Sequence, residues 1–191
     1  NLTIQDNFFQ NTLGSGNSAI WLREVSGALT VQDNVIDTTG YGGILLIDGF
    51  TGSTLVDGNQ ISNTPQQGLQ LAGVVNGATV SNNTITSANT DDDGDKGGIR
   101  IYGENFTDTV NIFGNTISGS HNGIAVKDGM DITGKDINVY DNDLAGNSNF
   151  GLYHGGTGLV DASLNWWGAN DPAVVATRIS GSDVDYSPWY A

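Results

Sequence analysis

One short phrase recurs along this chain, and the repetition limits its possible folds more than any other feature. It first reads LTIQDNFF at residues 2–9 and returns almost unchanged as LTVQDNVI at residues 29–36. Weaker copies follow, each centred on one asparagine. These asparagines are Asn7, Asn34, Asn59, Asn83, Asn115, Asn142 and Asn165, and the steps between them are 27, 25, 24, 32, 27 and 23 residues. Repeats of this length are typical of solenoid proteins.

Apolar and polar residues alternate within each copy, which is the period of a half-buried strand. Between copies, a glycine or another small residue precedes further alternating apolar positions. The instances are Ala19-Ile20, Gly43-Ile44, Gly68-Leu69, Gly98-Ile99, Gly123-Ile124 and Gly151-Leu152. No sustained helical stripe of apolar residues occurs before the last segment, so helical solenoids are excluded. We therefore predict an all-β fold, a β-solenoid of about six coils with parallel strands ~4.8 Å apart.

The recurring asparagines predict a structural ladder rather than a catalytic set. Equivalent residues of successive coils lie above one another in a solenoid, so each side-chain amide would bond the next one at the turns. Asparagine also tolerates the left-handed backbone conformation and satisfies backbone groups in turns.

The 191 residues are enough for one domain, residues 1–191, which we divide into repeat coils (1–158) and a C-terminal cap (159–191). Asp171 followed by Pro172 predicts the start of one short helix that covers the last coil. Trp166, Trp167 and Trp189 would help to close this end. No comparable cap precedes Leu2. We therefore expect the native protein to continue beyond it, or the first coil to associate end to end with a partner.

Composition excludes several classes of function. The chain has 6 Lys and Arg residues against 21 Asp and Glu, a formal net charge of −15, so it cannot neutralise a run of phosphates and nucleic acid is excluded as a partner. Its apolar runs are far shorter than the ~20 residues that cross a bilayer, so no membrane insertion is expected. With no cysteine, neither a disulfide nor a thiolate metal site can form.

At its end the chain reads NWWG at residues 165–168 and VDYSPW at residues 184–189. Together with the coils, this closing segment resembles the right-handed parallel β-helix proteins with pectate-lyase-like repeats, and the resemblance covers the whole chain. It implies a right-handed solenoid and a secreted or cell-surface location. It implies no particular reaction, because this fold carries lyases, hydrolases, epimerases, adhesins and passive stalks.

The densest charge lies in the longest repeat step, where residues 89–98 read NTDDDGDKGG. Asp91, Asp93 and Asp95 offer the oxygen ligands that Ca²⁺ prefers, and the start of this segment has the spacing of an EF-hand loop. An EF-hand is rejected because the twelfth position is Arg100 instead of glutamate. A Ca²⁺ site in an enlarged turn is one prediction, and a solvated acidic loop is the alternative.

Outward positions of the second phrase form two columns that collect cations and aromatic rings. The first column is Trp21, Leu45, Gln70, Arg100, Ala125 and Tyr153, and the second is Arg23, Ile47, Ala72, Tyr102, Lys127 and Gly155. Aromatic rings stack on sugars, and cations hold sugar carboxylates or sulfates. We therefore predict a glycan-binding strip at Trp21, Arg23, Arg100, Tyr102, Lys127 and Tyr153.

Two classes of function follow. The preferred one is a non-catalytic stalk or adhesin module of a secreted or cell-surface protein, with Ca²⁺ and polysaccharide or other surface components as partners. The alternative is a carbohydrate-active enzyme, a polysaccharide lyase or uronate epimerase, in which Arg100 and Lys127 would act one coil apart on an acidic polysaccharide. The sequence contains no Asp-Pro-His-Glu run like that of the alginate epimerases. One glycosylation sequon occurs, Asn105-Phe106-Thr107.

Overall fold

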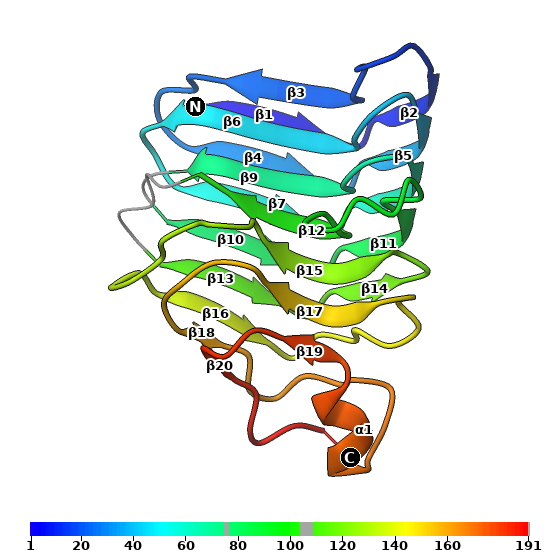
Figure 1. Ribbon diagram of the computed structural model, residues 1–191. Coiled ribbons are helices and arrows are strands. Elements are labelled where there is room, and N and C mark those ends of the chain that lie inside the picture. The colour runs from blue at the N-terminus through cyan, green and yellow to red at the C-terminus, as the bar shows by residue number, and fades with distance from the viewer. Residues whose placement is uncertain (75–76, 104–108, 191) are drawn as a thin grey trace.

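The chain winds into a parallel β-solenoid of about seven turns, as seen in the computed structural model (Figure 1). The structure describes residues 1–74, 77–103 and 109–190, so the sequon at Asn105 lies outside the described residues. The paired strands within these ranges are parallel, and successive turns stack strand on strand into three sheets. The predicted all-β solenoid is confirmed.

Within the described residues, each of the first five turns gives one strand to each sheet, and the later turns add strands only to the first and third sheets. The first sheet contains β1 (Leu2–Gln5), β4 (Leu29–Gln32), β7 (Thr54–Asp57), β10 (Ala78–Ser81), β13 (Val110–Phe113), β16 (Ile137–Tyr140), β18 (Val160–Asp161) and β20 (Val184–Asp185). The second sheet contains β2 (Phe8–Thr12), β5 (Val35–Thr39), β8 (Gln60–Thr64), β11 (Thr84–Ala88) and β14 (Thr116–Ser118). The third sheet contains β3 (Ile20–Arg23), β6 (Ile44–Phe50), β9 (Leu69–Val74), β12 (Ile99–Tyr102), β15 (Asn122–Val126), β17 (Phe150–His154) and β19 (Ile179–Ser180).

The core is one continuous column of aliphatic side chains inside the solenoid. In the first sheet, Val56 pairs with Val31 on one side and Val80 on the other, and all three are fully buried. Ile85 of the second sheet and Ile99 of the third are also fully buried. The alternation in the sequence produces this arrangement because every second side chain of a strand points to the same face.

The repeated asparagines stack at the corner between the first and second sheets. Asn59 Nδ2 donates to Asn83 Oδ1 at 2.9 Å, and Asn83 Nδ2 donates to Asn115 Oδ1 at the same distance. Each step from Asn7 to Asn165 repeats this bond. The same Oδ1 also accepts the backbone N–H of the preceding asparagine, and Asn83 Nδ2 donates to the carbonyls of Val56 and Ser81. The buried amides are therefore satisfied by one another and by the backbone.

The residue before each ladder asparagine has a positive φ. These residues are Asp6, Asp33, Gly58, Asn82, Gly114, Asp141 and Leu164. Glycine, Asn and Asp adopt this conformation at low cost, whereas a leucine there is strained. The corner thus requires two special residues in succession, which explains the Asp-Asn and Gly-Asn pairs of the repeat.

The glycines before the third-sheet strands are required by close packing between turns. A Cβ on Gly98 would lie 2.3 Å from Ile117 Cγ2, and one on Gly68 would lie 2.7 Å from Ile85 Cγ2. Both distances are far below van der Waals contact, so the backbone can lie this close to the core only where the residue has no side chain.

The last turn is built from the segment predicted as a cap. β18 and β20 extend the first sheet, with Val160 paired to Val184, and β19 extends the third. The solenoid therefore has about seven turns where the repeats predicted about six, because these two-residue strands are too short to show alternation.

One helix occurs in the described residues, α1 (Pro172–Ala176), and it begins as predicted. Asp171 is its N-cap, and its Oδ1 accepts the N–H of Ala173 at 2.8 Å. Trp167 is buried beneath the last turns, against Gly151. Nowhere in residues 1–74, 77–103 and 109–190 is a helix long and apolar enough to span a membrane.

The first turn, at the opposite end of the solenoid, consists of β1, β2 and β3. β1, β2 and β3 each lie at the end of their sheet, and Phe8 and Leu13 of this turn are 66% and 63% exposed. End-to-end association through this turn stays a prediction.

Candidate functional site

The outward side chains of the third sheet form columns in the register that alternation predicts. Trp21 pairs with Leu45, Gln70 pairs with Arg100, and Tyr102 pairs with Ala72 in the neighbouring column. Lys127 follows β15, and its backbone N–H donates to Ile101 O at 3.0 Å, which places it one turn from Tyr102. Cations and rings from separate turns are thus brought onto one face.

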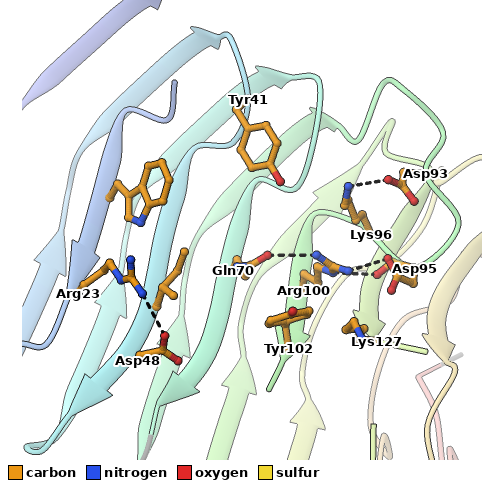
Figure 2. A pocket seen from close by; sticks show the side chains of 12 residues that line it. Arg23, Tyr41, Asp48, Gln70, Asp93, Asp95, Lys96, Arg100, Tyr102 and Lys127 are labelled. Carbon is orange, nitrogen blue, oxygen red and sulfur yellow. Dashed lines mark hydrogen bonds and ion pairs between the residues drawn. The ribbon is translucent and has the colours of Figure 1, made fainter. Parts of the chain in front are cut away.

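These columns line a pocket of about 630 Å³ (Figure 2). Its lining residues are Trp21, Arg23, Tyr41, Ile47, Asp48, Gln70, Asp93, Asp95, Lys96, Arg100, Tyr102 and Lys127. It crosses five successive strands, from β3 to β15, which is roughly 19 Å along the solenoid axis. The pocket is long in the direction perpendicular to the strands.

Positive charge is concentrated in this pocket. Of the chain's six Lys and Arg residues, four line it: Arg23, Lys96, Arg100 and Lys127. The rest of the molecule therefore carries 18 of the 21 acidic residues and only two cations, so the acidic excess lies entirely outside the pocket. A concave surface with cations on an acidic protein favours one class of ligand, an anion that also contacts rings.

Three of the four cations pair with carboxylates of the same pocket. Arg100 Nη2 lies 2.7 Å from Asp95 Oδ1, and these side chains are only 9% and 15% exposed. Lys96 Nζ lies 2.5 Å from Asp93 Oδ2. Arg23 Nη2 lies 3.4 Å from Asp48 Oδ2, with both side chains more than half exposed, so this pair contributes little to stability.

Arg100 is the most completely held cation. Its Nη1 donates to Gln70 Oε1 at 3.3 Å, and its Nε donates to the backbone carbonyl of Asp95 at 3.2 Å. Its Cζ lies 4.8 Å from the centroid of the Tyr102 ring, and Lys127 Nζ lies 5.0 Å from the same centroid. Tyr102 therefore makes cation–π contacts with cations from two turns.

Two aromatic side chains of the pocket face solvent. Trp21 is 54% exposed and Tyr102 is 37% exposed. They lie three strands apart, roughly 14 Å, and both belong to the predicted glycan strip. Exposed rings of this kind stack on the apolar faces of sugar rings.

The structure places five of the six predicted glycan-strip residues in the pocket lining, and the sixth, Tyr153, outside it. Tyr153 Oη donates to Asp128 Oδ1 at 2.5 Å. This hydrogen bond, followed by burial, raises the pKa of Tyr153 to about 12. The phenol is therefore held by an acid of the neighbouring turn.

The carboxylates predicted to bind Ca²⁺ point in different directions. Asp93 and Asp95 face the pocket cations, whereas Asp91 Oδ2 accepts from Gln66 Nε2 at 2.8 Å. Within the described part of the chain, no group of three or more His, Asp or Glu side chains lies close enough to hold a metal ion. Ca²⁺ binding stays a prediction.

Sequence reasoning missed part of the pocket. Tyr41, Asp48 and Lys96 line it but lie outside the regular alternation of the strands that identified the strip. Gln70 stands next to Arg100 in the first outward column, so its place in that column was the sequence signal that could have identified it. The structure shows that the two side chains are hydrogen-bonded.

Comparison with known proteins adds a family. A model of the right-handed β-helix region matches residues 1–144 of the chain, and the handedness agrees with the predicted one. No curated protein matches the chain, and no solved structure matches it.

Proposed function

This chain belongs to the right-handed β-helix family, and on that basis we propose that it is a non-catalytic, glycan-binding module of a secreted or cell-surface protein. Its ligand is an acidic polysaccharide that lies in the pocket of the third sheet. The observation that carries the proposal is the gathering of four of six cations and two exposed rings in one concavity of a chain with net charge −15.

The shape of the pocket supports a polymer rather than a small ligand. It extends across five strands with Trp21 near one end and Lys127 near the other. An extended saccharide chain would run along the solenoid axis, stack a sugar on Trp21 and place a carboxylate at Lys127.

The scaffold suits a stalk or adhesin. The asparagine ladder and the aliphatic core continue from turn to turn without interruption, so the strands that carry the pocket form one rigid body. A rigid support reduces the conformational entropy that binding would otherwise cost.

The enzymatic alternative makes a different demand on the same residues. A lyase or epimerase needs a base that removes a proton next to the uronate carboxylate. Arginine is always protonated, so Arg100 cannot be that base. Lys127 is the pocket cation with no ion-pair partner among the described residues, and an enzyme of this class would therefore depend on it.

Calorimetric titration with hyaluronan oligosaccharides, in which a uronic acid alternates with a neutral sugar, tests the proposal. The control ligand is the same oligosaccharide with its carboxyl groups reduced to alcohols. We expect Lys127→Gln to weaken binding of the acidic form by about tenfold, since one charge-assisted contact is lost. Trp21→Ala should weaken binding of both forms, because it removes a stacking surface.

Lys135→Gln is the matched variant, since it removes the same charge from a lysine that does not line the pocket. It should bind as the native protein does. Absence of binding by either form of the oligosaccharide would refute the proposal. Release of unsaturated products, abolished by Lys127→Gln, would establish the lyase instead.

A further inference from the structure

The acidic segment between β11 and β12 is a fixed part of the pocket wall. Asn89 is fully buried, and its Nδ2 donates to the carbonyls of Asp93 and Lys96 at 2.8 and 3.0 Å. Asn122 of the next turn donates from its Nδ2 to the carbonyls of Gly94 and Lys96. Two buried amides thus clamp residues 89–97 against the solenoid, so Asp93 and Asp95 have defined positions.

This clamped segment supplies the pocket with carboxylates of its own. Asp95 covers the guanidinium of Arg100, and Asp93 covers the ammonium of Lys96, as Figure 2 shows. The Asp95–Arg100 pair is nearly buried, so it is shielded from solvent and keeps its strength better than an exposed pair. A ligand anion that approached Arg100 would have to displace Asp95 or lie beside it.

The formal charges in the pocket leave one cation unmatched. Four cations and the three carboxylates Asp48, Asp93 and Asp95 give four minus three, a net charge of +1. Among the described residues that line the pocket, Lys127 is the unmatched cation, since each of the other three cations has a carboxylate partner.

We propose that Asp95, assisted by Asp93, determines the specificity of this site by restricting it to glycans whose carboxylates are isolated from one another. This inference rests on the proposed function. One uronate carboxylate binds at Lys127, and neutral sugars lie along Trp21 and past Arg100. A polymer with an anionic group on every residue is rejected because its next charge meets Asp95.

The physical basis is selectivity by repulsion. Two like charges at close range repel more strongly near a protein surface than in bulk water, because the effective dielectric constant there is lower. Such unfavourable contacts discriminate between ligands that share all of their attractive contacts. Neutralising Asp95 should therefore create a second anion site at Arg100, which has the fork of donors that matches a carboxylate.

The test compares two oligosaccharides of equal length in calorimetric titrations at low salt. One is the hyaluronan oligosaccharide, with alternating carboxylates, and the other is an oligogalacturonate, with a carboxylate on every residue. The native protein should prefer the alternating ligand. Asp95→Asn should raise the affinity for oligogalacturonate by about tenfold and change that for hyaluronan much less.

Asp91→Asn is the matched control, because it changes the net charge equally, in the same segment, at a carboxylate that contacts Gln66 instead of a pocket cation. It should leave the preference unchanged. The Asp95→Asn variant retains a side-chain oxygen that can accept from Arg100 and the backbone carbonyl that accepts from Arg100 Nε, so it should fold and melt as the native protein does.

The outcomes separate the inference from the proposed function. If the native protein binds both ligands equally, or if Asp95→Asn leaves the preference intact, the specificity role of Asp95 is refuted and glycan binding stands. If Asp91→Asn raises the oligogalacturonate affinity as much as Asp95→Asn, net charge decides the preference and the role of Asp95 is again refuted. If neither ligand binds, both proposals fail.

Discussion

The asparagine corner and the pocket of the third sheet are both built from side chains stacked turn on turn, but they differ in composition, contacts and burial. In the corner, each turn contributes the same residue, and each amide bonds its own copy one turn away. In the pocket, the turns of β3, β9 and β12 contribute Trp21, Gln70 and Arg100, and the contacts join unlike groups. The corner asparagines from Asn34 to Asn165 are buried, whereas Trp21 and Tyr102 of the pocket are exposed to solvent.

This comparison separates two kinds of residue. The corner residues stabilise the solenoid, and the pocket residues distinguish this chain from other solenoids. A column of identical residues forms the same hydrogen bonds at every turn, so it stabilises the repeating fold and distinguishes no turn from another. A column of unlike residues does not form such a repeating set of bonds. Its side chains are therefore available for recognition, and the insertion at residues 89–97 enlarges that column further.

The largest expected effect comes from breaking the corner at its centre. In Asn83→Asp, a carboxylate oxygen would replace the Nδ2 that donates to Val56 O, Ser81 O and Asn115 Oδ1. A buried charge facing three acceptors should reduce the free energy of unfolding by about 3–5 kcal/mol. Chemical denaturation at neutral pH measures the loss.

Asn7→Asp is the control for that substitution, since Asn7 makes the same ladder bond at the exposed end. Its loss should stay below about 1 kcal/mol because water solvates the new carboxylate. Equal losses of unfolding free energy at the two positions would contradict the view that burial determines how much a ladder asparagine contributes to stability.

A glycine comparison sharpens the contrast between core and pocket wall. A Cβ at Gly98 would overlap Ile117 Cγ2, whereas nothing lies within 4 Å of one at Gly94. We expect Gly98→Ala to cost about 1–3 kcal/mol in denaturant unfolding, which is the usual effect of overpacking a core.

Gly94→Ala should leave stability within about 0.5 kcal/mol of the native protein, and pocket binding should survive it. A large loss at Gly94 would mean that the clamped segment tolerates no change, and the distinction between core and pocket wall would fail there.

The sequence predicted what is periodic. Alternation and the spacing of the asparagines were sufficient for the strands, the ladder and the outward columns, because each depends on contacts that recur every turn. The pairing of Asp95 with Arg100 was not predictable in this way. It arises from the one long step of the repeat, where residues leave the strand period, and the segment interpreted as a Ca²⁺ turn or a solvated loop forms contacts in the pocket.

A melting experiment with Ca²⁺ tests whether the segment of residues 89–97 also binds a metal ion. If Asp91, Asp93 and Asp95 bind Ca²⁺, millimolar Ca²⁺ should raise the melting temperature relative to EDTA, because a ligand that binds only the folded state stabilises it. The rise should be at most a few degrees, since Gln66, Lys96 and Arg100 already hold these carboxylates. The triple variant with asparagine at all three positions should abolish it, and an equal rise in that variant would exclude this segment as the site.

The smallest effect at neutral pH concerns Tyr153, which stands in the same outward column as Arg100 but outside the pocket. Its hydrogen bond to Asp128 and its burial raise its pKa from 10.0 to about 12. Asp128→Asn should move the pKa of Tyr153 back toward 10, which an alkaline titration of tyrosinate absorbance measures. Tyr153→Phe lacks the phenol and therefore identifies which absorbance change belongs to Tyr153. Asp141→Asn removes the corresponding acceptor of Tyr190 and should leave the pKa of Tyr153 unchanged.

Because the folded pKa lies above the unfolded one, the contribution of this pair to stability is fully present below pH 10 and is lost as the pH rises through about 12. The native protein and Asp128→Asn should therefore differ most below pH 10 and converge in strong alkali. If Tyr153→Ala binds the glycan as the native protein does at neutral pH, Tyr153 is outside the binding surface. A loss of binding in Tyr153→Ala would extend the pocket by one turn, to the residue that alternation had assigned to it.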